Sequence, residues 1–197
     1  MDKKEEMKKI KDEIIDLKIS PLYQYRVENN YFPVIGEGSH DADIVFIGEA
    51  PGKNEAETAR PFCGRSGKLL DEMLASISLP REKIYITNIV KDRPPANRDP
   101  LPNEIELYAP YLDRQIEIIK PKVLATLGRF SMQYIMERYG LKHEVKPISN
   151  MHGKVFETEM NYGKVHVVPL YHPAVAIYNQ HSKKDLLEDF QVLKQFI

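Results

Sequence analysis

The chain has 197 residues, of which 42% are hydrophobic, so it can bury a substantial core, and we expect one domain over residues 1–197. Its 28 Lys and Arg residues balance 29 Asp and Glu residues, which excludes a globally basic protein drawn to nucleic acid by its overall field. The single cysteine, Cys63, excludes an internal disulfide framework and any site built from four thiolates, and it is typical of a small buried hydrophobe.

The first predicted element is a helix over residues 5–17, where apolar residues recur at helical spacing until Ser20 and Pro21 stop it. Residues 1–12 are charged and have no apolar core of a signal peptide. No apolar stretch approaches the roughly 20 residues that a membrane span needs. We therefore expect a cytoplasmic protein with no membrane partner.

Strand and helix patterns then alternate along the chain. Apolar runs predict strands over residues 44–47, 84–90, 123–127, 155–156 and 165–170. Helical spacing appears over residues 68–77, 102–119, 131–138 and 184–196, and a proline-rich loop covers residues 93–102. This alternation predicts a three-layer α/β/α sandwich around a mostly parallel central sheet.

Several polar residues follow the predicted strands directly. Glu49, Asn88 and His172 each come at a strand end, and Gly128 follows another. Loops that leave the carboxyl ends of parallel strands usually carry the chemistry of such a fold. The sequence therefore predicts a site along this edge of the sheet.

Taken singly, these residues have ordinary structural interpretations. The Gly-Glu-Ala-Pro-Gly turn at residues 48–52 has no Lys and no Gly-x-Gly, so it is neither a phosphate-binding P-loop nor a dinucleotide fingerprint. Glu49 alone suggests a solvated turn residue, Phe62 a core residue and His172 a structural histidine. Asn88 could cap a turn, or its amide could read a uracil-like edge by accepting from the imide N–H and donating to a carbonyl.

The order of five motifs is more informative than any one of them. They are Gly-Glu-Ala-Pro-Gly (48–52), Arg-Pro-Phe-x-Gly-Arg-x-Gly (60–67), Tyr-Ile-Thr-Asn-x-x-Lys (85–91), Arg-Pro-Pro-x-Asn-Arg (93–98) and His-Pro-Ala (172–174). This series resembles the uracil-DNA glycosylase superfamily across residues 14–195. The nearest match is its family 4, the thermostable branch that carries an iron–sulfur cluster.

The resemblance implies a uracil-DNA glycosylase fold and a monofunctional hydrolase of base excision repair. Such an enzyme flips uracil out of DNA, because the glycosidic bond is inaccessible within the base stack, and hydrolyses that bond. By resemblance, Phe62 stacks on the uracil, Asn88 reads its polar edge and His172 donates a hydrogen bond to its carbonyl. Ala50 and Gly52 belong to the same uracil-binding motif.

The resemblance leaves the catalytic carboxylate open. Glu49 matches the acidic residue of the first motif and could orient water or stabilise a cationic sugar. Glu55 also fits the family pattern, although the Asp that usually follows it is Ala56 here. Either glutamate could act on water.

The residues expected to contact DNA also differ from the family pattern. Tyr178 stands about where relatives often place Arg, and an aromatic wedge is suited to unstacking a base step. Arg65, Lys183 and Lys184 are candidate phosphate contacts, although a lysine pair at a helix start is equally consistent with a solvated face.

The cysteines that hold the cluster in relatives are replaced. Alignment on the flanking prolines places Leu17, Ser20, Asp92 and Tyr108 at the four ligand positions. None is a thiolate, so we expect no iron–sulfur cluster, no other metal and no cofactor. We expect apolar contact of Leu17 with Tyr108, and an Asp92–Ser20 hydrogen bond, in its place.

Two other functions stay open. One is a glycosylase for other deaminated bases, such as hypoxanthine or xanthine. The other is a non-catalytic uracil-binding or DNA-binding homologue, although residues 128–131 show no histidine-bearing insertion of the kind found in relatives that bind uracil-DNA irreversibly. The motifs hold no evident Lys nucleophile, so strand cleavage is not expected. We expect a monomer whose partner is uracil-containing DNA, with a sliding-clamp partner left open.

Overall fold

A computed structural model describes residues 2–197, apart from the side chains of Tyr178, Gln180 and His181. The strands are β1 (Glu37–Gly38), β2 (Ile44–Gly48), β3 (Tyr85–Asn88), β4 (Val123–Leu127), β5 (Phe156–Met160) and β6 (Gly163–Leu170). The helices are α1 (Lys3–Ile15), α2 (Tyr23–Glu28), α3 (Lys53–Thr58), α4 (Arg65–Ser76), α5 (Pro102–Ile119), α6 (Arg129–Arg138), α7 (Val175–Tyr178) and α8 (Gln180–Gln191). Short 3-10 turns cover Arg81–Lys83, Pro95–Asn97, Lys142–Glu144, Ile148–Asn150 and Val192–Phe196.

The six strands form one sheet in the order β1-β3-β2-β4-β6-β5. The four central strands run parallel, while β1 and β5 pair antiparallel at the two edges. The mostly parallel central sheet predicted from the sequence is therefore confirmed.

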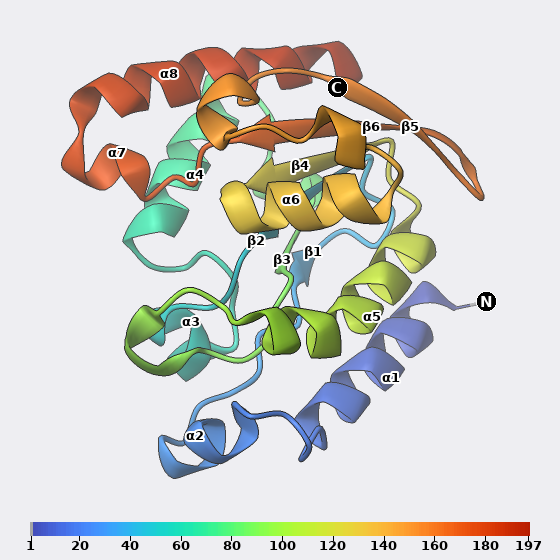
Figure 1. Cartoon of the computed structure of the whole chain (residues 1–197), viewed down its shortest axis with the longest axis vertical. Coiled ribbons are helices and arrows are strands. Elements are labelled where there is room, and N and C mark those ends of the chain that lie inside the picture. The colour runs from blue at the N-terminus through green and yellow to red at the C-terminus, as the bar shows by residue number, and fades with distance from the viewer. Residues whose placement is uncertain (1) are drawn as a thin grey trace.

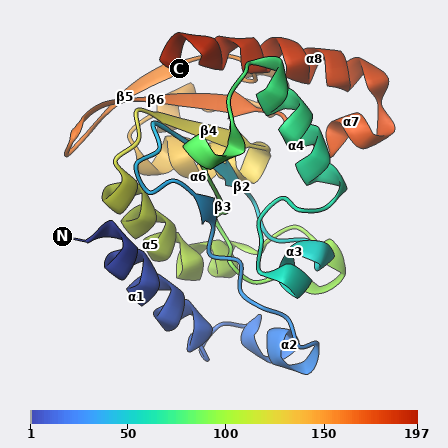
Figure 2. The ribbon, with the colours of Figure 1, turned by 180° about the vertical axis from the view of Figure 1, so that it is seen from behind.

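Two apolar clusters lie on opposite faces of the sheet because successive strand side chains point to opposite sides. Val45 and Ile47 of β2 pack with α1, α5 and α6, whereas Ile44 and Phe46 pack with α4 and α8. The sheet thus lies between two helical layers, with α6 facing the viewer in Figure 1 and α4 in Figure 2. This confirms the three-layer sandwich.

The register of the central strands brings their carboxyl ends to one edge. Asn88 at the end of β3 pairs with Gly48 at the end of β2, so Glu49 lies one residue beyond the level of Asn88 on the neighbouring strand. Leu127 pairs with Leu170, which places the residues after β4 and β6 beside them. Within residues 2–197, no helix is both long and apolar enough to cross a bilayer.

Candidate active site

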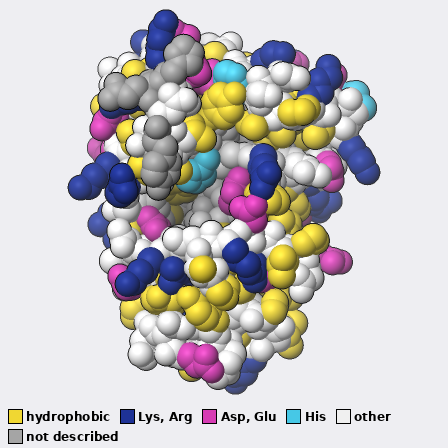
Figure 3. Space-filling view, turned by 60° about the vertical axis from the view of Figure 1, so that its left-hand side comes forward, with side chains coloured by type: hydrophobic (Ala, Val, Ile, Leu, Met, Phe, Trp, Pro, Cys, Tyr) yellow, Lys and Arg dark blue, Asp and Glu magenta, His cyan; other side chains and the backbone are white. Residues whose placement is uncertain are grey.

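A cavity of about 300 Å³ opens at this edge of the sheet. Figure 3 shows the hollow, with histidine and acidic side chains at its rim and basic side chains around it. Its walls come from the loops after β2, β3 and β6, the start of α4 and the proline-rich loop. The lining residues are Glu49, Ala50, Pro51, Gly52, Glu55, Phe62, Ser66, Asn88, Pro94, Asn97, Arg98, Asp99, Pro100, His172 and Ala174.

The cavity brings together every residue that the sequence assigned to catalysis or uracil binding. The sequence did not indicate that the proline-rich loop lines the cavity, although its Arg-Pro-Pro-x-Asn-Arg motif belongs to the family series. Arg98 in that loop is held by Glu104 at 2.5 and 2.9 Å, and Asp99 pairs with Arg129 at 2.6 Å. These ion pairs fix the loop against α5 and α6.

Phe62 forms one wall in a left-handed backbone conformation, with φ of 47°. Its ring lies 5.7 Å from the His172 ring, centroid to centroid, and its side chain is 6% exposed. Two glycines make room for it. A Cβ on Gly67 would lie 1.8 Å from the Phe62 carbonyl oxygen, and one on Gly48 would lie 2.8 Å from the Phe62 ring. The aromatic wall therefore depends on glycine at both positions.

Asn88 lies at the end of β3 and is only 2% exposed. Its side-chain amide has no hydrogen-bond partner among the described residues, and it is open to the cavity rather than sealed inside the protein. A Cβ on Gly48 would lie 2.3 Å from its Oδ1, so Gly48 again provides the space. The amide is free to pair with a ligand in the cavity.

His172 is held as a neutral hydrogen-bond donor. The Ala174 N–H donates to its Nδ1 at 3.1 Å, which leaves the proton on Nε2. Burial lowers the pKa of His172 to about 4, against a weaker opposing effect of Glu55. The imidazole is therefore uncharged near neutral pH and carries a donor hydrogen on Nε2.

The two candidate glutamates have different surroundings. Burial raises the pKa of Glu49, whose Oε1 accepts one long bond from the Phe130 N–H at 3.3 Å. Glu55 instead uses Oε1 to accept the N–H groups of Cys63 at 3.0 Å and Gly64 at 2.9 Å. Glu55 thus binds the backbone next to Phe62, while Glu49 has few partners in the cavity.

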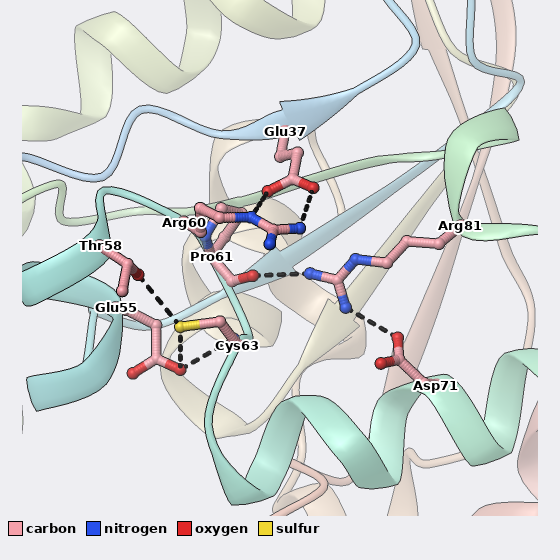
Figure 4. A network of polar contacts seen from close by, with 8 residues as sticks. All are labelled: Glu37, Glu55, Thr58, Arg60, Pro61, Cys63, Asp71 and Arg81. Atoms are coloured by element: carbon pink, nitrogen blue, oxygen red, sulfur yellow. Dashed lines mark hydrogen bonds and ion pairs between the residues drawn. The ribbon is translucent and has the colours of Figure 1, made fainter.

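Further polar contacts fix the same loop from its other side (Figure 4). Arg60 forms two bonds to Glu37, at 2.8 and 2.9 Å. Arg81 donates to the Pro61 carbonyl at 2.6 Å and to Asp71 at 2.8 Å. These partners were missed by sequence reasoning, because Glu37 and Arg81 lie outside the motifs. They hold the backbone on which Phe62 sits.

Arg65, Lys183 and Lys184, three of the predicted DNA-contact residues, lie outside the cavity lining. Arg65 is exposed at the start of α4. Lys183 pairs with Glu72 at 2.5 Å, and exposed Lys184 is 3.6 Å from Glu188. Tyr178 ends α7, and its side chain lies outside the described residues.

The four positions of the family's cluster come together but form a different structure. Tyr108 donates to the Asp92 carboxylate at 2.5 Å, and the Ser20 and Tyr108 hydroxyls are 2.8 Å apart. Buried Arg26 donates to both Asp92 oxygens at 3.1 Å. The expected Asp92–Ser20 hydrogen bond is therefore wrong, because the Tyr108 hydroxyl lies between the two side chains. Leu17 and Tyr108 do belong to one apolar cluster.

This donor set does not fit an iron–sulfur cluster, which thiolates hold. Leu17 offers no donor atom, and the hydroxyls of Ser20 and Tyr108 are engaged with each other and with Asp92. Burial raises the pKa of the Asp92 carboxyl, while Tyr108 and Arg26 oppose that effect. The Asp92 carboxylate forms an ion pair with Arg26, so it is not available to bind a metal ion.

Known proteins are similar to this chain over most of its length. The family model described as the uracil DNA glycosylase superfamily matches residues 35–194. A type-4 uracil-DNA glycosylase of Sulfurisphaera tokodaii is 45% identical over 190 residues, covering 96% of this chain and 84% of that protein. One from Archaeoglobus fulgidus is 47% identical over 85% of this chain and 82% of its own, and one from Thermotoga maritima is 39% identical over 83% and 82%. The chain belongs to the uracil-DNA glycosylase superfamily.

Proposed function

We propose that this protein is a monofunctional uracil-DNA glycosylase. One observation carries the proposal. An aromatic ring, an unpaired amide, a neutral imidazole donor and a largely buried carboxylate line one cavity of about 300 Å³. These groups match the faces of a flipped uracil nucleotide: a flat ring, an imide edge, a carbonyl oxygen and a sugar that becomes cationic.

The proposed reaction breaks the bond between the sugar C1′ and uracil N1. The bonding electrons leave with uracil, whose carbonyl oxygens gain negative charge, and His172 donates its Nε2 hydrogen bond there. Phe62 stacks on the base and Asn88 pairs with its imide edge. Water then adds to C1′ and gives one proton to the Glu49 carboxylate, and that proton balances the charge of the uracil anion when uracil leaves as the neutral base. The product is an abasic site in DNA. Ala50 and Gly52 form the cavity wall beside the base.

We assign to Glu49 the two roles of accepting a proton from water and stabilising the cationic sugar. We assign to Glu55 the role of holding the loop that carries Phe62. We expect Glu49→Gln to lower kcat about 10²-fold, because a neutral amide neither stabilises the cation nor accepts a proton. Glu55→Gln keeps an oxygen for the two backbone N–H groups, so a loss of only a few-fold is expected. Single-turnover rates on a uracil oligonucleotide measure both. Equal losses in the two variants would contradict this division.

One assay distinguishes uracil excision from the two alternative functions, which are excision of other deaminated bases and a non-catalytic binding role. Oligonucleotides containing uracil, hypoxanthine or xanthine are incubated with the protein and cleaved with alkali at any abasic site. Cleavage at uracil alone supports the proposal. Binding of the uracil duplex with no alkali-labile site would overturn it in favour of a binding protein.

We propose that no iron–sulfur cluster is bound and that the Ser20–Tyr108–Asp92–Arg26 network, called here the N-terminal network, takes its structural place. Its residues join the segment after α1 to the loop after β3. Iron analysis of the purified protein tests the first part. A brown preparation with about four iron atoms per chain, the number in a [4Fe–4S] cluster, would refute it.

Tyr108→Phe tests the second part. We expect it to lower the free energy of unfolding by about 1–3 kcal/mol, because Asp92 and Ser20 lose a buried partner while the ring is kept. Urea unfolding measures the change. Tyr111→Phe is the matched control on the same helix, where the tyrosine is only partly buried. Equal effects of the two variants would argue against the network.

We also propose that residues 1–197 form one domain, and that the protein is a monomer in the cytoplasm.

We propose that DNA is contacted by four residues: Arg65, Tyr178, Lys183 and Lys184. Arg65 is already exposed, whereas Lys183 can bind a phosphate only after its ion pair with Glu72 breaks. We expect Arg65→Ala to reduce the slope of log affinity against log salt by about 0.9 for one lost phosphate contact. Titrations of labelled duplex at several salt concentrations measure the slope, and an unchanged slope would exclude this contact.

A further inference from the structure

Lys91 is a buried amino group that the proposed chemistry does not use. Its side chain is 0% exposed and it does not line the cavity. Within the described residues, no carboxylate forms an ion pair with it, although a buried charge is normally paired. Such an amino group is costly to bury, so the three acceptors that bind it indicate what its position contributes to the fold.

The amino group of Lys91 donates to three acceptors. These are the Asn88 carbonyl at 2.6 Å, the Thr87 hydroxyl at 2.7 Å and the Gln115 side-chain oxygen at 2.7 Å. The Thr87 hydroxyl donates onward to the Ile35 carbonyl at 2.7 Å, and the Gln115 amide donates to the same carbonyl at 3.0 Å. Lys91 is therefore fixed by β3, by α5 and by the segment before β1.

The contact with Asn88 fixes the peptide that follows it. The Ile89 N–H donates to the Gly48 carbonyl at 3.0 Å, while Lys91 holds the carbonyl of the same peptide unit from the other end. The Asn88 side chain has no hydrogen-bond partner of its own among the described residues, so its direction into the cavity is set by this backbone and by packing at Gly48.

We propose that Lys91 is a positioning residue, which fixes the Asn88 backbone so that the Asn88 amide meets uracil at the productive angle. The inference rests on the proposed role of Asn88 as the reader of uracil. It makes uracil recognition depend on a side chain outside the cavity. A displacement of about 1 Å at a reacting group can cost about 10²-fold in rate.

A double-mutant cycle tests the inference. Lys91→Met keeps the aliphatic stem and removes the donors, and we expect it to lower kcat/KM for uracil about 10–10²-fold. In an Asn88→Ala background, the same substitution should change kcat/KM by less than about twofold, because its effect passes through Asn88. Free uracil should also inhibit Lys91→Met more weakly than the wild type.

The controls separate positioning from general stability. The Thr87→Val variant removes one partner of Lys91 and keeps its contacts with the Asn88 carbonyl and Gln115, so near wild-type kcat/KM is expected. If Lys91→Met alone does not fold, the cycle is run with Lys91→Met/Thr87→Val/Gln115→Leu, in which apolar groups replace the unpaired partners.

Two outcomes overturn the inference in different ways. Equal losses from Lys91→Met with and without Asn88 would show that Lys91 acts independently of the amide, while the role of Asn88 would stand. Wild-type kcat/KM in Asn88→Ala alone would remove the proposed role of Asn88 itself, and the inference with it.

Discussion

Replacing His172 by Ala is expected to slow uracil release about 10²–10³-fold, the loss typical of one donor removed from a developing anion. The physical reason is the Nε2 hydrogen that the Ala174 N–H fixes by occupying Nδ1. Since this donor matters most when charge has built up on the departing base, kcat should fall more than KM rises. Single-turnover kinetics on a uracil duplex measure the change, and His143→Ala, on an exposed side chain, is the matched control.

The pH dependence tests the charge state of the same residue. Burial lowers the pKa of His172 to about 4, so its neutral form is populated throughout pH 6–9 and contributes no step in rate there. As pH falls through the raised pKa of Glu49, and then through that of His172, the rate should decrease. A rate that instead rises as pH falls toward 4 would mean that the imidazolium is the active form.

Asn88→Ala is expected to lower kcat/KM for uracil about 10²–10³-fold and to abolish inhibition by free uracil. The amide lines the cavity and has no partner in the described part of the chain, so we expect it to contribute to recognition and to form no hydrogen bond that stabilises the fold. The melting temperature should therefore change little, because no hydrogen bond of the fold is lost. Asn161→Ala is the matched control, since that amide bonds to Glu117 at the surface. A lower melting temperature with full activity would make Asn88 a structural cap.

Much of the fold was predictable because its signals are local. The apolar run at 44–47 is a buried central strand, and helical spacing marked α1, α4 and α5. A strand was predicted over residues 84–90, whereas β3 ends at Asn88. The backbone N–H groups of Ile89 and Val90 nevertheless donate to the Gly48 and Glu49 carbonyls, so these two residues still lie beside β2. The antiparallel edge strand β1 was missed because two residues carry too little pattern.

The site was predictable as a set of residues, but the distinctions within it were not. Glu49 and Glu55 stayed equivalent because the backbone N–H groups that engage Glu55 lie eight and nine residues away in the chain. Lys91 could be recognised as part of a motif, but its three partners come from β3 and α5. Only the folded arrangement shows that it touches the Asn88 carbonyl.

The N-terminal network shows a similar limit. Tyr108 was predicted as an apolar replacement, and its ring is indeed buried. Its hydroxyl lies between Ser20 and Asp92, and Arg26, which sequence reasoning did not consider, completes the set. Residue types at four aligned positions do not reveal a fifth partner that approaches from another helix.

That network has a consequence for how the protein is made. Every atom in it belongs to the chain, so the connection between the N-terminal segment and the loop after β3 forms in the same event as folding. Under the proposal that no cluster is bound, maturation requires neither a supply of iron nor a cluster-assembly pathway, and oxygen has no cluster to destroy. A molecule that unfolds in air should regain this connection on refolding, whereas a join that depends on an inserted cluster is lost with the cluster.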